Sequence, residues 1–181
     1  MQEYILETER LLLRNWREAD ILPFSQMNQD QEVMEFMPKV LTPAESEAWA
    51  LKMQEFIAEE GYGLLAVQLK KTGEFIGYTG VFPVTFAASF APASEIGWRL
   101  AKSFWRKGYA TEAAKACLAA IPQWGITGRL VSFTTVANVR SESVMKKLGL
   151  RKSYEFNHPK LASEHPLSRH VLYELENGTI K

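Results

Sequence analysis

The sequence predicts one α+β domain with a largely antiparallel sheet and a single crossover after its central strand. Glu95–Leu100 roughly alternates polar and apolar side chains, as a strand does, and leads into a short basic turn. Apolar residues then recur at intervals of three and four, as in a helix that lies on a sheet: Ala110, Ala113, Ala114, Cys117, Leu118 and Ile121. Upstream, the turn-rich Lys70–Gly73 joins two apolar runs and indicates an antiparallel hairpin.

The first half of the chain supplies a strand, two helices and this hairpin. Arg10–Arg14 is a short apolar run bounded by charge, which is typical of a strand. A helix is expected over residues 20–27, with Pro23 in its first turn, where proline is tolerated. Thr42, Pro43 and Glu45 form a helix-start signature with a capping box, and that helix ends near Gly61. The hairpin strands are expected at residues 64–69 and 75–82, before a loop over 83–94.

The second half continues the alternation of strand and helix. The β-branched run 130–136 predicts a strand, and 140–148 predicts a short helix that ends at Gly149. Residues 151–156 and 169–174 are expected to form the closing strands. The predicted order is β, α, α, β, β, β, α, β, α, β, β, and a single domain over residues 1–181 accommodates it.

Composition restricts the possible partners and compartment. With 181 residues, of which 46% are hydrophobic and 23% charged, the chain suits a soluble domain with a substantial core. The net charge of zero gives no indication of a nucleic-acid partner. We find no secretory signal and no apolar stretch long enough to cross a membrane, so a cytoplasmic protein is expected, and a homodimer is compatible with it. The single cysteine, Cys117, excludes an intrachain disulfide and is expected to be a small buried hydrophobe.

The turn between the central strand and the Ala-rich helix is a candidate anion site. The first backbone N–H groups of a helix lack intrahelical partners and point outward together with the positive end of the helix dipole. Gly108 lets the backbone approach a phosphate closely, while Arg106 and Lys107 add positive charge. The alternative is an ordinary turn with two solvated basic residues. The segment lacks the glycine spacing of a Walker A loop or a dinucleotide fingerprint, which disfavours a nucleotide binder of the P-loop type.

Trp105–Ala110 resembles the pyrophosphate loop of the GNAT-type N-acetyltransferases, a Gln/Arg-x-x-Gly-x-Gly/Ala pattern, with Trp105 as a departure at the first position. A second landmark of that family, Asn-x-x-Ser before a short helix that ends in Leu-Gly, is similar to Asn138–Leu150. Leu6–Arg14 and Asp20 resemble the start of the ribosomal-protein (RimJ/RimL-like) branch. The resemblance implies the GNAT fold, in which the fourth and fifth strands splay apart around the pantetheine arm of acetyl-CoA. It also implies cofactor contacts at Trp98, Arg99, Leu100, Arg106, Lys107, Gly108, Tyr109, Ala110, Thr111 and Asn138.

The implied reaction transfers an acetyl group to a primary amine by direct attack. Such an amine is mostly protonated at pH 7 and needs a base, for which Glu95 at the start of the central strand is the candidate; the alternative is an exposed strand carboxylate. Many family members place a tyrosine acid where this chain has Met145, whose thioether has no proton to give. Ser141 is the nearest substitute, although Ser141 and Asn138 are also typical of helix starts.

The remaining expected site residues are substrate contacts. Phe36, Phe82 and His158 are expected to line the acceptor mouth, with His158 as an alternative base; the alternative for the two aromatic residues is the core, where aromatics of helices and strands more often lie. The three histidines match no metal-ligand spacing, and the reaction needs no metal. Two functions follow. The first is an acetyl-CoA-dependent N-acetyltransferase that acts on a protein amino terminus or a small amine. The second is a catalytically inactive CoA-binding sensor or partner module, a hypothesis that depends on Met145 at the position of the usual acid.

Overall fold

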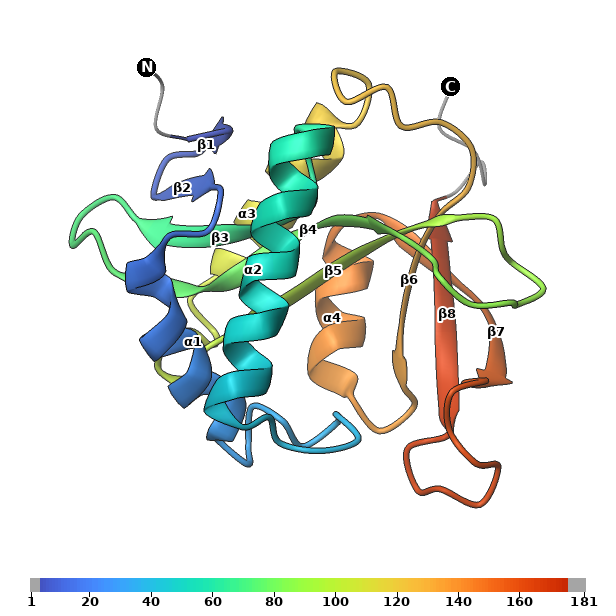
Figure 1. Cartoon of the computed structure of the whole chain (residues 1–181). Helices are drawn as coiled ribbons and strands as arrows, with labels where there is room; N and C mark the ends of the chain where they lie inside the picture. Colours follow the sequence, from blue (N-terminus) through green and yellow to red (C-terminus); the bar gives the residue numbers. More distant parts are fainter. Residues whose placement is uncertain (1–3, 176–181) are drawn as a thin grey trace.

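The computed structural model describes residues 4–175 and contains one mixed sheet with helices on both faces (Figure 1). The strands are β1 (Leu6–Glu7), β2 (Leu11–Arg14), β3 (Leu64–Leu69), β4 (Phe75–Pro83), β5 (Ser94–Leu100), β6 (Leu130–Thr135), β7 (Leu150–Asn157) and β8 (Arg169–Leu175). The helices are α1 (Glu18–Gln29), α2 (Pro43–Glu60), α3 (Tyr109–Ala120) and α4 (Val139–Lys147), and a 3-10 turn, η1, spans Lys102–Phe104. No helix within residues 4–175 has the length and hydropathy needed to cross a bilayer.

The sheet has the strand order β1-β2-β3-β4-β5-β6-β8-β7, and every neighbouring pair is antiparallel except β5 and β6. This arrangement confirms the predicted hairpin and the single crossover through α3. The sequence did not predict β1, which consists of two residues paired with Leu12 and Leu13 and is too short to show a period. All other predicted strands and helices are present, with ends shifted by a few residues.

Two helix starts show how local sequence fixes the elements. Thr42 caps α2 as predicted: its side chain accepts from the Glu45 N–H at 3.2 Å, and the Glu45 carboxylate accepts from the Thr42 N–H. α1 starts earlier than predicted, at Glu18, so that Pro23 lies inside the helix and not in its first turn. Asp20 explains the early start, because its carboxylate accepts from the Arg17 N–H while it forms a buried ion pair with Arg14.

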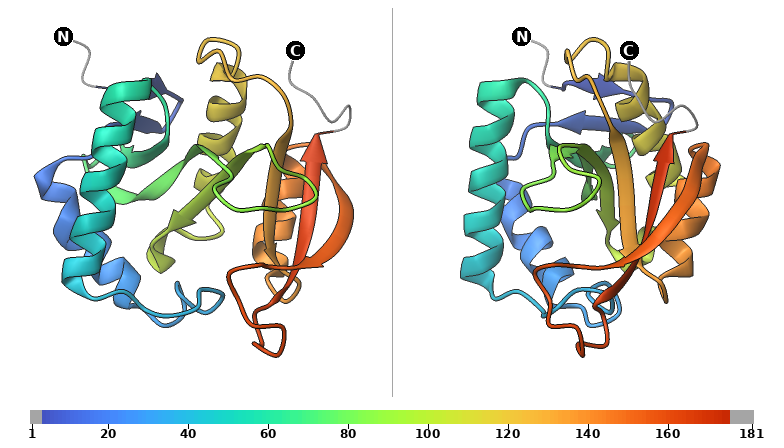
Figure 2. Two further views of the ribbon diagram at one scale, coloured as in Figure 1. Left: turned by 45° about the vertical axis from the view of Figure 1, so that its right-hand side comes forward. Right: turned by 90° about the vertical axis from the view of Figure 1, so that its right-hand side faces the viewer.

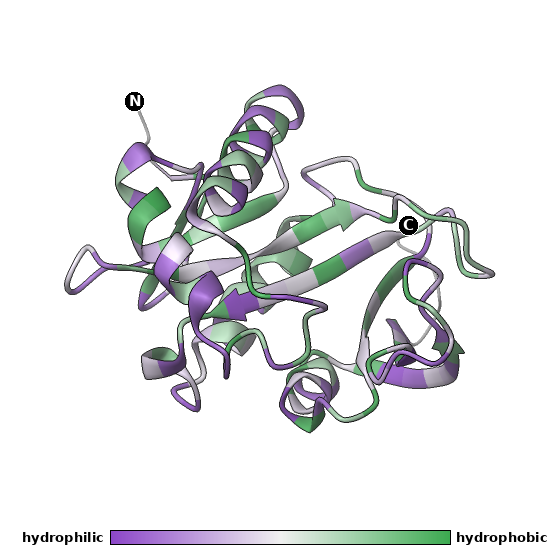
Figure 3. Cartoon of the chain, turned by 60° about the horizontal axis from the view of Figure 1, so that its bottom comes forward, coloured by the Kyte–Doolittle hydropathy of each residue, from purple (hydrophilic) through white to green (hydrophobic). Residues whose placement is uncertain are grey.

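The helices divide the molecule into three layers. α1 and α2 cover one face of the sheet, and α3 and α4 cover the other (Figure 2). Along the helices hydrophobic and hydrophilic residues alternate, as expected for helices with one face on a sheet (Figure 3). The α3 face that meets the sheet is made of small residues, among them the fully buried Cys117, whose thiol pKa is raised by burial to about 12. Cys117 is therefore a packing residue, as predicted.

The centre of the sheet is split. β5 and β6 pair only at Ser94 with Leu130 and Glu95 with Val131, after which the two strands diverge. Five residues of β5, from Ile96 to Leu100, and four of β6, from Ser132 to Thr135, therefore have no partner strand on that side. This gap lies between the fourth and fifth predicted strands, β5 and β6.

Candidate active site

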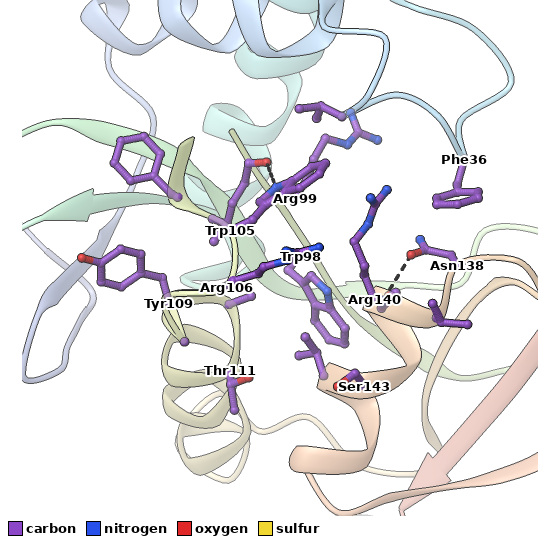
Figure 4. A pocket seen from close by; sticks show the side chains of 18 of the residues that line it. Phe36, Trp98, Arg99, Trp105, Arg106, Tyr109, Thr111, Asn138, Arg140 and Ser143 are labelled. Atoms are coloured by element: carbon purple, nitrogen blue, oxygen red, sulfur yellow. Dashed lines mark hydrogen bonds between the residues drawn. The ribbon is translucent and has the colours of Figure 1, made fainter. Parts of the chain in front are cut away.

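A cavity of about 480 Å³ opens beside the split on the face that carries α3 and α4. We call it the α3/α4 pocket. β5 and the following turn supply one wall, α4 supplies the opposite wall, and Phe36 and Met37 from the α1–α2 connection close one end (Figure 4). Its lining includes Trp98, Arg99, Leu100, Arg106, Gly108, Tyr109, Ala110, Thr111, Asn138 and Ser141.

The amino terminus of α3 opens into this pocket without a side-chain cap. Gly108 is the capping residue and adopts the left-handed region at φ 83°, and Arg106 does so at φ 60° although it has a side chain. Arg10 supports the turn from behind: its guanidinium donates to the Lys107 carbonyl at 3.0 Å and pairs with Glu112 of α3. The Arg10 contacts therefore hold this turn in place, with the free N–H groups of the first turn of α3 directed at the pocket. Free N–H groups at a helix amino terminus are a common binding site for phosphate groups.

Arg140 of α4 contacts two residues of the α1–α2 connection, Glu35 and Phe36. The Arg140 guanidinium lies 4.6 Å from the centre of the Trp105 ring and 5.5 Å from that of Phe36. It also donates to Glu35 at 2.6 Å. Figure 4 shows the Arg140 side chain extending from α4 between Trp105 and Phe36. A second ion pair, between Glu32 and Lys102, joins the same connection to η1.

Asn138 and Ser141 lie at the start of α4 and line both pockets. Asn138 caps the helix: its side-chain oxygen accepts from the Ser141 N–H at 3.1 Å, and its amide donates to the Thr134 hydroxyl. The Ser141 hydroxyl makes no recorded hydrogen bond within residues 4–175, and Ser141 lines the pocket. Met145 is 1% exposed and belongs to the core, so nothing at this position reaches the pocket.

A second cavity, also about 480 Å³, lies on the opposite face of the split, and we call it the α1/α2 pocket. Glu95, Phe82 and Phe36 line it together with two histidines, His158 and His170. The Glu95 side chain runs along β5 over Gly97, where an added Cβ would lie 3.9 Å from its Oε1. Burial raises the pKa of Glu95 to about 8, and the nearby Lys160 opposes this shift. Glu95 is therefore largely protonated at pH 7, with a pKa close to the value that suits a general base.

The histidines of this pocket are held neutral. Burial is the main cause that lowers the pKa of His158 to about 4, and the neighbouring His170 and Lys160 lower it further. Burial also lowers the pKa of His170, against the effect of its hydrogen bond to the Ser168 carbonyl. The described residues contain no group of three or more metal-ligating side chains. His158 thus lines the α1/α2 pocket as a weak base.

The two pockets meet at the split. The residues that line both of them are Phe36, Met37, Trp98, Arg99, Asn138 and Ser141. These shared residues lie where the two pockets adjoin, beside the gap between β5 and β6.

Comparison with known proteins agrees with this architecture. Residues 10–151 match the model of the acetyltransferase (GNAT) domain. The chain belongs to the GNAT acetyltransferase family. Its relatives include the uncharacterised protein YkkB of Bacillus subtilis (strain 168), which is 30% identical over 155 residues that cover 82% of this chain and 86% of YkkB.

Solved structures show the same GNAT fold. A GNAT-family acetyltransferase from Bacillus anthracis superposes with a TM-score of 0.76 at 24% identity and covers 94% of this chain and 96% of its own. The ribosomal-protein α-N-acetyltransferase RimL, in complex with coenzyme A, superposes with a TM-score of 0.72 at 17% identity and covers 95% of this chain and 97% of its own. The chain that carries the uncapped amino terminus of α3 and the split sheet therefore has the acetyltransferase fold.

Most of the residues predicted from sequence lie together in this GNAT domain. All of the predicted cofactor residues line the α3/α4 pocket except Lys107, whose ammonium lies 5.5 Å from the Phe104 ring centre. Glu95, Phe82 and His158 line the other pocket, and Ser141 and Phe36 line both. Arg140 and Thr135 were not predicted as site residues, and His158 was preferred to His170 at the acceptor mouth, because only the fold brings these side chains to the pockets.

Proposed function

We propose that this chain is an acetyl-CoA-dependent N-acetyltransferase that acetylates a primary amine by direct attack. The acceptor is a protein amino terminus or a small amine, as in the RimJ/RimL-like branch. The observation that carries the proposal is the meeting of the two pockets at the split, with the uncapped α3 terminus at one end and Glu95 on the opposite face. The residues present fit coenzyme A because Gly108 leaves the backbone N–H groups open to a diphosphate.

Each residue then has a chemical role. Acetyl-CoA supplies the acetyl thioester. The free edge of β5 at Trp98–Leu100 faces the gap, where its backbone N–H groups are placed to stabilise negative charge on the thioester oxygen. As the C–N bond forms, Glu95 takes the proton of the amine directly or through water; as the C–S bond breaks, Ser141 donates a hydrogen bond to the leaving sulfur.

Replacing the base tests the proposal most simply. Glu95→Gln keeps the shape of the side chain and removes its proton affinity, so thiol release from acetyl-CoA with a panel of amines and amino-terminal peptides should fall about 100-fold. Acetyl-CoA affinity, measured by calorimetry, should stay within about two-fold, because Glu95 does not line the α3/α4 pocket. Glu74→Gln, at an exposed carboxylate of the hairpin turn, is the matched control.

The burial of Met145 supports a second candidate, a CoA-binding sensor or partner module without catalysis. The two functions separate on the same assay. The sensor binds acetyl-CoA and releases no thiol with any amine, and its behaviour is the same in wild type and Glu95→Gln.

A further inference from the structure

Arg99 carries a positive charge that no carboxylate neutralises. Arg99 is half-buried on β5 and forms no ion pair with a carboxylate within residues 4–175; its guanidinium donates to the Asn28 Oδ1 at 3.0 Å and to the Met37 sulfur at 2.8 Å. Both acceptors are neutral, and a thioether is a weak one. Five other arginines do pair with carboxylates: Arg10, Arg14, Arg129, Arg140 and Arg169. The Arg99 guanidinium therefore keeps the capacity to bind an anionic oxygen.

Neighbouring side chains hold Arg99 in position. Asn28 is fully buried, and its amide donates to the Ser46 hydroxyl at 3.1 Å, which fixes the oxygen that Arg99 contacts. The guanidinium also lies 5.4 Å from the centre of the Tyr78 ring, to which it is attracted as a cation. Because the planar donor fork is already fixed, it loses little conformational freedom when it binds a ligand.

Lys160 gives the α1/α2 pocket a second positive charge. Its ammonium lies 5.5 Å from the centre of the Phe86 ring and forms no ion pair in the described part of the chain. Among the described residues that line this pocket, Glu95 is the only carboxylate, so the lining is positive whether or not Glu95 is ionised. The pKa of Glu95, about 8, leaves it mostly uncharged at pH 7. Such a pocket attracts anions and repels cations.

The floor of the pocket is open between Glu95 and Arg99. Successive residues of a strand point to opposite faces, so Glu95, Gly97 and Arg99 share one face of β5, and all three line the pocket. Gly97 has no side chain, and within 4 Å a Cβ there would meet only the Glu95 Oε1, at 3.9 Å. Four residues of strand, about 13 Å, separate Glu95 from Arg99. A ligand therefore has room to lie along β5 between these two side chains.

We propose that the acceptor carries an anionic group, a carboxylate or a phosphate, which pairs with the Arg99 guanidinium while the amine lies near Glu95. The anionic oxygens replace the Met37 sulfur as acceptors of the Arg99 N–H groups, and Lys160 adds to the positive potential of the pocket. This inference rests on the proposed function and narrows its acceptor to amines that bear an acidic group. Polycationic amines such as spermidine are then poor acceptors, because the pocket repels their charge.

Matched pairs of amines, in which one member is anionic at the tested group and the other is neutral there, test the proposal. The pairs are phenylalanine with phenylalaninamide, 4-(aminomethyl)benzoate with 4-(aminomethyl)benzamide, and O-phosphoethanolamine with ethanolamine. The first two place a carboxylate at two distances from the amine, and the third carries a phosphate. Calorimetry on the full chain saturated with coenzyme A measures affinity without turnover, and with any phosphate contact of the cofactor already made.

We expect the anionic member of at least one pair to bind roughly ten-fold or more tightly than its neutral partner, because charge-assisted hydrogen bonds to a guanidinium distinguish them. The pair with the larger ratio tells a carboxylate acceptor from a phosphate acceptor. Equal or tighter binding of the neutral member in all three pairs, or tighter binding of spermidine than of every anionic amine, would overturn the proposal.

Variants of the two cations locate the preference. Arg99→Gln should lower the ratio of anionic to neutral affinity about ten-fold, whereas Arg99→Lys, which keeps the charge and loses the fork, should retain part of it. Lys160→Gln should lower the ratio about three-fold. Lys71→Gln, at an exposed lysine of the β3–β4 turn, is the matched control and should keep the ratio. An unchanged ratio in Arg99→Gln, with cooperative thermal unfolding, contradicts the assignment to Arg99.

The binding assay and the thiol-release assay fail independently. Preferential binding of anionic amines with no acetylation of any amine would end the transferase proposal and leave the anion site standing. Acetylation of amines with no preference for the anionic members in the calorimeter would leave the transferase standing and remove the anion site.

Discussion

The two pockets that meet at the split are built in different ways. The α3/α4 pocket is lined mainly by two short stretches, residues 98–111 and 138–147, and the groups that it offers a ligand at the α3 terminus are backbone N–H groups. The α1/α2 pocket is lined by residues of the α1–α2 connection, five strands, the start of α4 and the loop before β8, and it offers side chains. Recognition by backbone depends on local geometry, so a short motif encodes it. Recognition by side chains depends on the assembled fold.

The largest effect that separates the pockets is expected at Gly108. Gly108→Ala forces a side chain into the left-handed region and turns the free N–H groups of α3 away from the pocket, so acetyl-CoA affinity should fall roughly 10- to 100-fold by calorimetry. Gly61→Ala is the matched control, because Gly61 has φ 76° at the end of α2 with open space around it. Both variants should lose about 1–2 kcal/mol of unfolding free energy.

Only Gly108→Ala should lose acetyl-CoA binding. If Gly61→Ala weakens binding equally, the effect is one of general stability, and the backbone of the α3 terminus is not the phosphate site.

A smaller effect is expected where the pockets meet. Ser141→Ala removes one hydroxyl donor and should lower kcat about five-fold without a loss of thermal stability, because alanine keeps the N–H that Asn138 caps. Asn138→Ala should show the other pattern and lose about 1 kcal/mol of unfolding free energy. Ser141→Ala with wild-type kcat would remove the serine from the mechanism.

The smallest effect concerns stability and pH. Glu95 has a pKa of about 8 in the folded protein against an ordinary value of 4.5, so the native state holds the proton more tightly than the unfolded state. Its contribution to stability is therefore present below about pH 4.5 and is lost as the pH rises toward 8. Since the side chain is partly exposed, Glu95→Gln should gain on the order of 1 kcal/mol over wild type at pH 9 relative to pH 5. Thermal melts at the two pH values measure this difference, and an equal difference at both would contradict the raised pKa.

The parts of the molecule that were predictable from sequence are those with a local cause. The apolar stripe of α3, the capping box of α2 and the turn at Gly108 each depend on neighbouring residues, and each lies where it was expected. The strand β1 has too few residues to show a period. The start of α1 also has a local cause, which the sequence analysis missed: the Asp20 carboxylate accepts from the Arg17 N–H and so begins the helix before Pro23.

The same distinction holds within the site. Lys107 was expected beside the phosphate from its place in the motif, but its side chain lies against Phe104 while its carbonyl accepts from Arg10. Thr135 and His170 are 35 residues apart in sequence and adjacent in the sheet, and only the strand order β6-β8-β7 brings them together. No periodicity or spacing predicts such a pair.

A crystal structure of the chain with acetyl-CoA tests the central claim most directly. We predict the diphosphate within about 3 Å of the backbone nitrogens at the start of α3, near Gly108, and the pantetheine arm in the gap between β5 and β6. The thioester should lie beside Trp98 and Ser141, where the two pockets meet. A diphosphate bound elsewhere, or β5 and β6 paired along their whole length with the arm outside the gap, would contradict the account.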